Sequence, residues 1–143
     1  MKKYLICLGL SSLVTFMSQG QKVKSTDIPG VVKTNLFKRY PAAKNVMWEK
    51  EKGNYEANWG GKLKEDNSAL FTPAGEFIEF VKAMPVSQLP PGVKEYVKMH
   101  YKGAKITEAG KVTDANGKTS YEAEVNRKDV VFDEKGNFVK EED

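Results

Sequence analysis

The spacing of apolar residues changes along the chain from a helical to a strand period. From Ile28 to Tyr40 an apolar residue recurs every four positions, which is the spacing of one buried helix face. The period then shortens to two, as in residues 54–59, where Tyr55 and Trp59 belong to a series of apolar positions that alternates with polar ones. The pattern predicts a helix followed by strands that are covered on one face only.

The same order of features returns in the second half of the chain. An apolar stripe over residues 89–101 predicts a second helix, and alternation in residues 121–126 predicts a strand. Turn sequences at 72–75 and 133–136 each end in a glycine, which can adopt positive φ and close a hairpin. Each half is therefore predicted to form one helix and four short antiparallel strands.

The helix ends carry their own signals. Thr26 or Asp27 is the candidate cap of the first helix and Ser87 that of the second, because hydroxyl and carboxylate oxygens accept bonds from the first free N–H groups. The first helix should stop before Pro41, and the second at Gly103.

The two halves are copies of one another. The segment IPGVVKTNLFKRYPAAK (28–44) returns 61 positions later as LPPGVKEYVKMHYKGAK (89–105), and the YEA and FxxxGxF patterns are also repeated. We expect repeats over 26–82 and 87–141, with five-residue insertions in loops of each. The predicted fold class is α+β, a tandem duplication with both helices on one face of an antiparallel sheet of about eight strands. Two separate four-stranded sheets are the alternative.

The first twenty residues have the composition of a secretory signal. Lys2 and Lys3 precede an apolar run too short to span a bilayer, and Ser18-Gln19-Gly20 offers small residues for cleavage. We expect a signal peptide over 1–20, one domain over 21–143, a periplasmic or secreted location, and no stable membrane insertion after cleavage.

Composition narrows the possible functions further. Removing Lys2 and Lys3 lowers the formal net charge from +4 to +2, and residues 21–143 contain no cysteine. Their lysines are scattered among carboxylates, whereas nucleic-acid surfaces favour clustered Lys and Arg. We therefore expect neither a nucleic-acid partner nor disulfides.

The repeated motifs resemble those of the PepSY-like family of secreted Bacteroidetes proteins. FKRYPAAKNVMWEKEKGNYEANW in the first copy, and HYKGAKI, YEAEV and FDEKGNF in the second, carry the resemblance over about residues 28–139. It implies a fold similar to that of β-lactamase-inhibitor protein, which covers an enzyme with one sheet face. It implies no catalytic residues, and a shared fold alone does not establish activity.

Few residues of the predicted domain could perform catalysis or bind metal. Its four serines occur outside a Gly-x-Ser-x-Gly motif, and His100, its single histidine, is expected to be half-buried and structural. One histidine without cysteine cannot build a typical zinc site. Loop carboxylates at 65–67 and 114–117 could bind calcium, although turn formation explains the latter. We expect no enzymatic activity and no cofactor.

The strand period places one set of polar side chains opposite the predicted helices. We expect a broad, mildly acidic, solvated face that binds a protein or peptide partner, as an inhibitor-like or chaperone-like module. Trp48 lies on the other parity and is assigned to the core. The alternative is a small-ligand or calcium binder that uses acidic strand and loop residues. The candidate binding residues are Met47, Glu49, Glu56, Asn58, Glu122 and Glu124.

Overall fold

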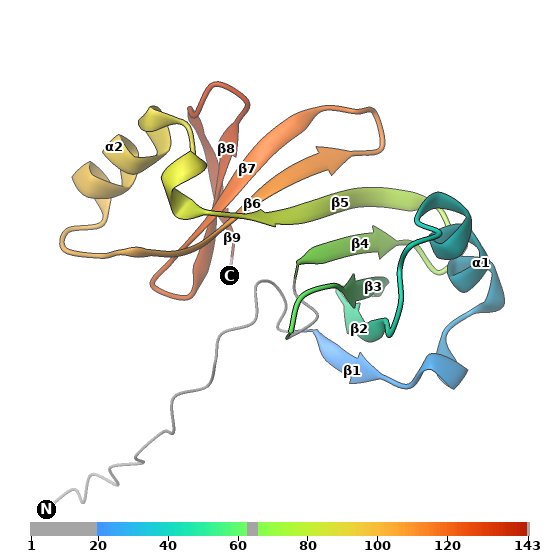
Figure 1. Cartoon of the computed structure of the whole chain (residues 1–143). Helices are drawn as coiled ribbons and strands as arrows, with labels where there is room; N and C mark the ends of the chain where they lie inside the picture. Colours follow the sequence, from blue (N-terminus) through green and yellow to red (C-terminus); the bar gives the residue numbers. More distant parts are fainter. Residues whose placement is uncertain (1–19, 63–65, 143) are drawn as a thin grey trace, which may run out of the picture.

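A computed structural model describes residues 20–62 and 66–142 of the 143-residue chain. The predicted signal segment therefore lies outside the described residues, except for Gly20. Figure 1 shows the course of the chain. The first half contains β1 (Gln21–Val23), η1 (Ser25–Asp27), α1 (Gly30–Arg39), β2 (Met47–Glu51), β3 (Asn54–Trp59), β4 (Asn67–Phe71) and β5 (Phe77–Met84). The second contains η2 (Val86–Gln88), α2 (Pro91–His100), β6 (Ile106–Asp114), β7 (Thr119–Val125), β8 (Lys128–Asp133) and β9 (Phe138–Glu142).

All of these strands belong to one antiparallel sheet. Its nine strands are ordered as they occur in the chain, from β1 to β9. Strands β5 and β6 join the two halves through six residue pairs, from Glu79 with Asp114 to Met84 with Ala109. The predicted α+β duplication with a shared sheet is confirmed, and the additional ninth strand is β1, which pairs with β2.

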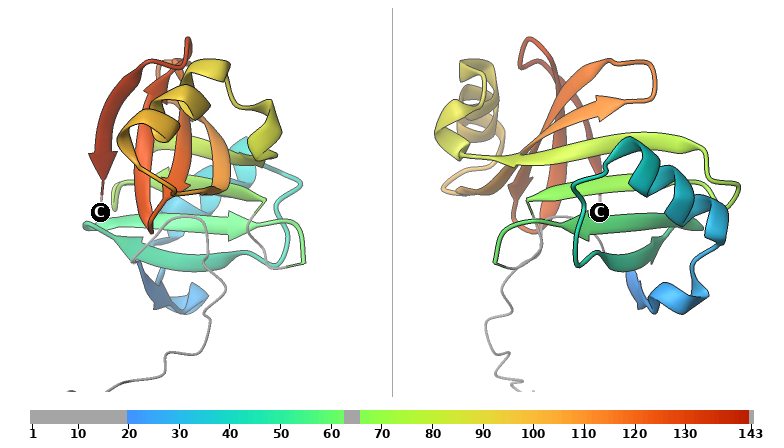
Figure 2. Two further views of the ribbon diagram at one scale, coloured as in Figure 1. Left: turned by 90° about the vertical axis from the view of Figure 1, so that its left-hand side faces the viewer. Right: turned by 45° about the vertical axis from the view of Figure 1, so that its right-hand side comes forward.

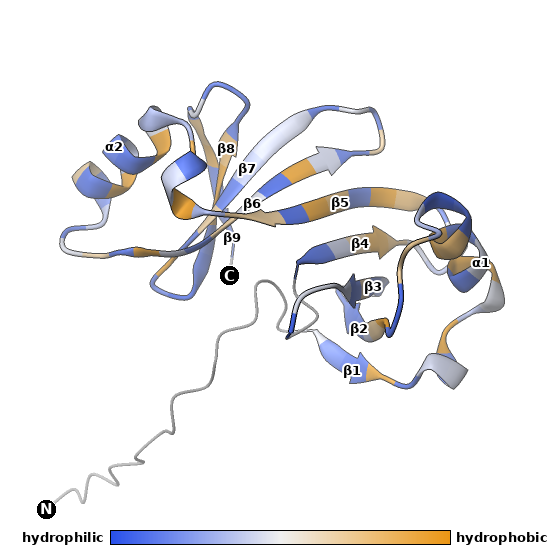
Figure 3. Ribbon diagram, in the orientation of Figure 1, coloured by the Kyte–Doolittle hydropathy of each residue, from blue (hydrophilic) through white to orange (hydrophobic). Residues whose placement is uncertain are grey.

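Both helices pack on the same face of this sheet. Ala57 of β3 and Ala69 of β4 are paired neighbours in the core beneath α1. Ala109 of β6 and Ala123 of β7 occupy the same position beneath α2. Phe80 and Met84 point to the same side of β5, and Phe80 packs against the first core while Met84 packs against the second, so the two cores lie on one face. Figure 3 shows how polar and apolar positions follow one another along β5, which connects them.

The predicted faces of the first-half strands are confirmed. Trp48, Ala57 and Trp59 are all at most 7% exposed and belong to the core beneath α1. Tyr55 is partly buried and packs against the same core. Large aromatic and small alanine side chains therefore fill the space between α1 and the sheet.

The predicted helix caps are wrong. Thr26 and Asp27 belong to the 3-10 turn η1, and Ser87 belongs to η2. The residues that precede α1 and α2 are Pro29 and Pro90, whose extended backbone leads the chain from each turn into its helix. Proline occupies this place in both repeats because its missing N–H needs no partner there.

The two terminal hairpins repeat the same turn. Gly75 and Gly136 have φ of 87° and 85°, in the region where a side chain is disfavoured. A register shift follows Leu70 in the first half and Val131 in the second. These shifts are β-bulges or irregularities next to the turns.

The phenylalanines that flank these hairpins differ in burial. Phe71 and Phe132 are fully buried in the two cores. Phe77 only packs against the first core, and Phe138 is 41% exposed. The first member of each pair therefore belongs to a core, whereas Phe138 stacks on Tyr96 of α2 at 4.6 Å between ring centroids.

The helix-free face of the sheet is concave. Glu51 and Asn54, in the hairpin between β2 and β3, line the same cavity as Lys140 and Glu142 of β9. These strands lie near opposite edges of the sheet order, so the sheet must curl to bring them together. Figures 1 and 2 show β8 and β9 turned strongly relative to β2, β3 and β4. Strand twist accumulates in one direction across a sheet, which produces this curvature.

Candidate functional site

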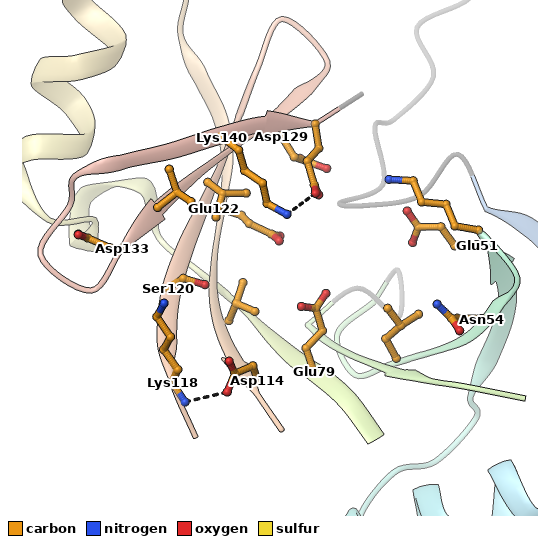
Figure 4. A pocket seen from close by; sticks show the side chains of 16 residues that line it. Glu51, Asn54, Glu79, Asp114, Lys118, Ser120, Glu122, Asp129, Asp133 and Lys140 are labelled. Carbon is orange, nitrogen blue, oxygen red and sulfur yellow. Dashed lines mark hydrogen bonds and ion pairs between the residues drawn. The ribbon is translucent and has the colours of Figure 1, made fainter. Parts of the chain in front are cut away.

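A cavity of about 360 Å³ occupies the concave face. Its lining side chains come from both repeats and converge on the space shown in Figure 4. The cavity therefore exists only when the two halves are joined in one sheet. It is lined by Glu51, Lys52, Asn54, Leu70, Glu79, Val112, Asp114, Lys118, Ser120, Glu122, Asp129, Val131, Asp133, Val139, Lys140 and Glu142.

Most of the charged groups in the lining are acidic, and another part of the lining is apolar. Seven of its side chains are carboxylates and three are lysines, which corresponds to a formal charge of −4 with every group ionised. Lys140 already contacts Glu142, with 2.5 Å between Nζ and Oε1. Val112 and Val131, which are 4% and 8% exposed, contribute aliphatic surface beside these charges. The cavity is thus suited to a ligand that is both positively charged and partly apolar.

Glu122 is the most buried carboxylate of this lining. It lies on β7 between Gly110 of β6 and Val131 of β8, and only 7% of it is exposed. Its Oε2 atom is buried and has no hydrogen-bond partner among the described residues. In Figure 4 its side chain points into the cavity. Burial raises the pKa of Glu122 well above its usual value, and the nearby Asp129 carboxylate raises it further.

The pKa values of the neighbouring carboxyl groups are raised as well. Burial, followed by the charge of Glu124, raises the pKa of Asp129 to about 6. Burial is also the largest cause of the raised pKa of Glu51 and of Glu79, and Glu142 contributes to both. Groups of one sign that share a poorly solvated space disfavour ionisation of each other.

Glu56 lies on the same face of the sheet, deeper in the first half. It is fully buried, and Ser68 Oγ donates a hydrogen bond to its Oε1 atom at 2.5 Å. The other oxygen, Oε2, has no hydrogen-bond partner within residues 20–62 and 66–142. Burial raises the pKa of Glu56 to about 7, although the bond from Ser68 opposes the shift. Glu56 therefore changes its protonation near neutral pH.

The expectation of a solvated acidic face is wrong. The curl of the sheet removes most of this surface from water, so that Met47 is intermediate in exposure and the other five candidates are at most 9% exposed. Glu122 is the single candidate that lines the cavity. The five that do not are Met47, Glu49, Glu56, Asn58 and Glu124.

Glu124 and Glu122 are neighbouring candidates with different surroundings. It lies two residues from Glu122 on the same strand face, but its Oε1 accepts a hydrogen bond from Thr107 Oγ1 at 2.7 Å. Glu122 instead lines the cavity, where its Oε2 has no bond in the described part of the chain. These two candidates on one strand face therefore have different surroundings.

Sequence reasoning missed most of the residues that line the cavity. Glu79 of β5, Asp129 of β8 and Lys140 of β9 have the strand parity of Glu122, but they lie in different strands. The alternation within each strand could have assigned these residues to the helix-free face. It could not predict that they line one cavity, because this depends on the β5–β6 pairing and on the curl of the sheet.

The loop and helix candidates have structural roles. Asp114 Oδ1 accepts bonds from the backbone N–H groups of Asn116 and Lys118 at 2.8 and 2.9 Å, so that it closes the β6–β7 turn. His100 is exposed rather than half-buried, and it stacks on Tyr96 at 3.9 Å. Its position at the end of α2 leaves it in contact with water. Glu65 lies outside the described residues.

The described residues contain no group of three or more His, Cys, Asp and Glu side chains placed to hold a metal ion. In the same part of the chain, no helix has both the length and the apolar character needed to cross a membrane.

Comparisons with known proteins identify a family whose sequence model matches both repeats. The sequence model of the PepSY-like family, described as "Putative beta-lactamase-inhibitor-like, PepSY-like", matches residues 14–78 and again 58–140. A comparison with curated proteins finds no match.

Solved structures from Bacteroides share the fold. A "putative periplasmic protein" of Bacteroides eggerthii is similar with a TM-score of 0.65 and 19% identity, over 80% of this chain and 87% of that one. A BLIP-like protein of Bacteroides fragilis is similar with a TM-score of 0.60 and 20% identity, over 80% and 85%. At identities of 19% and 20%, the similarity establishes a shared fold only.

Proposed function

The chain belongs to the PepSY-like family, and we propose that it is a non-enzymatic binding module that holds a peptide segment of a partner protein on its concave sheet face. The observation that carries this proposal is the cavity of about 360 Å³ on that face. Ligand sites in proteins are concave and combine apolar walls with a few polar groups. This face is concave, and its lining adds the aliphatic side chains of Leu70, Val112 and Val131 to a larger number of polar groups.

The size of the cavity limits what it can enclose. Its volume lies near the lower end of the range of about 300–1,000 Å³ for small-molecule sites, so one or two side chains fill it. A peptide bound here would insert a side chain between the β2–β3 hairpin and β9, whose residues line the cavity on its two sides. An inhibitor-like or chaperone-like role would follow from the identity of the partner.

Binding is favoured over catalysis by the placement of the reactive side chains. Ser120 lines the cavity, whereas His100 lies on α2, which packs on the other face of the sheet. A serine nucleophile needs a base within hydrogen-bond distance, and the sheet separates these two residues. The acidic side chains instead supply charge for recognition.

A periplasmic or secreted location is part of the proposal. It is supported by the apolar segment that follows Lys2 and Lys3. The solved structure from Bacteroides eggerthii, which shares the fold, is described as that of a "putative periplasmic protein". Detection of the protein in a periplasmic fraction, with cleavage after Gly20, would test this part.

The proposal is tested by closing the cavity. Peptides would be selected from a random library on the immobilised protein, and the best would be titrated against the wild type and Ser120→Trp. Ser120 is partly exposed on the cavity wall, so the indole can enter the cavity without entering a packed core. We expect affinity to fall at least tenfold, with an unchanged urea midpoint.

The matched control is Thr113→Trp, because Thr113 is also half-buried and lies on the other face of the sheet, paired with Phe80. Equal binding by wild type and Ser120→Trp would contradict the proposal, as would a library that yields no saturable binder.

A further inference from the structure

We infer that the cavity is a receptor for one alkylammonium group, with Glu122 as its counter-ion. The group could be the side chain of a lysine in the bound peptide or a free alkylamine, which share the same chemistry. This inference rests on the proposed function, because it names the chemistry that the concave face would recognise. It is carried by the charge of the lining, the free oxygen of Glu122 and the apolar wall.

The charge of the lining favours a cation. Seven carboxylates face three lysines around the cavity, and one of these lysines, Lys140, already contacts Glu142 at 2.5 Å. A positive ligand would reduce the mutual repulsion of the carboxylates, whereas an anion would increase it. The ligand should therefore carry at least one positive charge.

The Oε2 atom of Glu122 supplies a specific acceptor. It is buried, points into the cavity and has no hydrogen-bond partner in the described ranges. A buried polar atom without a partner is costly, and a charged donor can offset that cost. An ammonium group has three N–H donors and can contact several carboxylates around it at once.

The apolar part of the lining indicates an alkyl chain rather than a bare ion. Leu70, Val112 and Val131 contribute aliphatic surface to the wall. Lysine and simple alkylamines have the matching form, a flexible hydrocarbon stem that ends in a compact charge. A metal ion would leave this surface unused, and the cavity is far larger than a single ion.

Protonation gives an independent signature of this complex. Asp129, Glu79, Glu142 and Glu56 all raise the pKa of Glu122, after burial as the main cause. Lys140 is a nearby cation whose own pKa is raised by its bond to Glu142, and Lys52 and Lys118 also line the cavity. A bound ammonium would lower the pKa of Glu122. Binding near neutral pH should therefore release protons to the buffer.

The test is calorimetry of the purified full chain with two pairs of probes. The first pair is the peptide acetyl-Gly-Gly-Lys-Gly-Gly-amide and the same peptide with Nε-acetyl-lysine, which keeps the stem and removes the charge. The second pair is n-pentylamine and n-pentanol. Each titration is repeated in phosphate and in Tris, whose ionisation enthalpies differ, so that proton release can be counted.

Three variants accompany the wild type. Glu122→Gln removes the charge and keeps the shape, and Glu79→Gln does the same at the second cavity carboxylate. Glu134→Gln is the charge-matched control, since Glu134 is exposed in the β8–β9 turn, outside the cavity lining. Thermal melts verify that each variant is folded.

We expect the charged member of at least one pair to bind at least tenfold more tightly than its neutral partner, with release of protons. Glu122→Gln should reduce affinity at least tenfold and abolish proton release, Glu79→Gln should weaken binding less, and Glu134→Gln should match the wild type. Binding of the peptide alone would assign the site to a lysine side chain. Binding of pentylamine as well would assign it to the ammonium group itself.

Several outcomes would overturn the inference. They are equal binding of charged and neutral probes, wild-type affinity in Glu122→Gln, or no binding of either charged probe. The proposed function would survive all three if library-selected peptides still bound the wild type and lost affinity in Ser120→Trp. Failure of that separate experiment would instead remove the proposed function.

Discussion

At the scale of single residues, the buried carboxyl groups set this protein apart from an ordinary two-layer α+β domain. Glu56 is fully buried and Glu122 is 7% exposed, yet each has an oxygen without a hydrogen-bond partner among the described residues. Buried acids are costly when ionised. The protein therefore retains groups that reduce its stability at neutral pH, which is common at functional sites.

Glu56 predicts an unusual dependence of stability on pH. Its folded-state pKa of about 7 is above the ordinary value of 4.5. The stability it contributes is fully present below the unfolded pKa and is lost as pH rises through 7. Glu56→Gln should remove this loss, so that the variant gains about 2–3 kcal/mol relative to wild type between pH 5 and pH 8.

Urea unfolding at both pH values measures this difference, with Glu134→Gln as the exposed control. Wild type and Glu56→Gln differing by the same amount at pH 5 and pH 8 would show that Glu56 ionises normally. The burial of Glu56 contradicts the expectation of a solvated face, on which its replacement would have little effect on stability.

At the scale of elements, the β4–β5 hairpin is held against α1 and the β8–β9 hairpin against the start of α2. Asn35 of α1 donates a hydrogen bond from Nδ2 to the carbonyl oxygen of Gly75 at 2.8 Å. In the second half, a Cβ added to Gly136 would lie 3.0 Å from Cβ of Pro90 and 3.5 Å from the backbone nitrogen of Val93. Glycine is thus required in the second turn for both its φ and its close packing.

Comparing Gly136 with Gly117 distinguishes the cost of positive φ from the cost of crowding. Gly136 has φ of 85° and a crowded environment, whereas Gly117 has φ of 80° and no atom within 4 Å of an added Cβ. We expect Gly117→Ala to cost about 1 kcal/mol for the left-handed backbone, and Gly136→Ala about 2–4 kcal/mol because crowding is added. Denaturant midpoints of the two variants measure this. Equal losses would show that α2 does not restrict the turn.

At the scale of the whole molecule, the continuous sheet couples two repeats that each have their own core. The core beneath α1 and the core beneath α2 are separate clusters, and the six residue pairs between β5 and β6 connect them. The concave cavity adds a second connection, since the β2–β3 hairpin and β9 both line it. The repeats should therefore unfold together.

The tryptophans allow this cooperativity to be measured. Trp48 and Trp59 both lie in the core of the first repeat, so their fluorescence reports that half, while far-ultraviolet circular dichroism reports both. We expect the two signals to give coincident urea transitions, as in two-state unfolding. A fluorescence transition that precedes or follows the dichroism transition would show that the repeats unfold independently.

Local spacing in the sequence is sufficient to predict the duplication, the α+β class and the helix-facing side of β2, β3 and β7. These features follow from local spacing, because a period of two assigns alternate residues such as Glu56 and Ala57 to opposite faces. The predicted helix caps were wrong, because prolines precede both helices, and β1, which has only three residues, was not predicted.

The concave shape and partial burial of the helix-free face follow from the tertiary structure alone. Curvature arises from twist summed over nine strands and from the β5–β6 pairing. Glu51 and Glu142 are separated by most of the domain in sequence but line one cavity. Local spacing contains no information about such distant neighbours, so it could not distinguish a solvated acidic face from an acidic cavity.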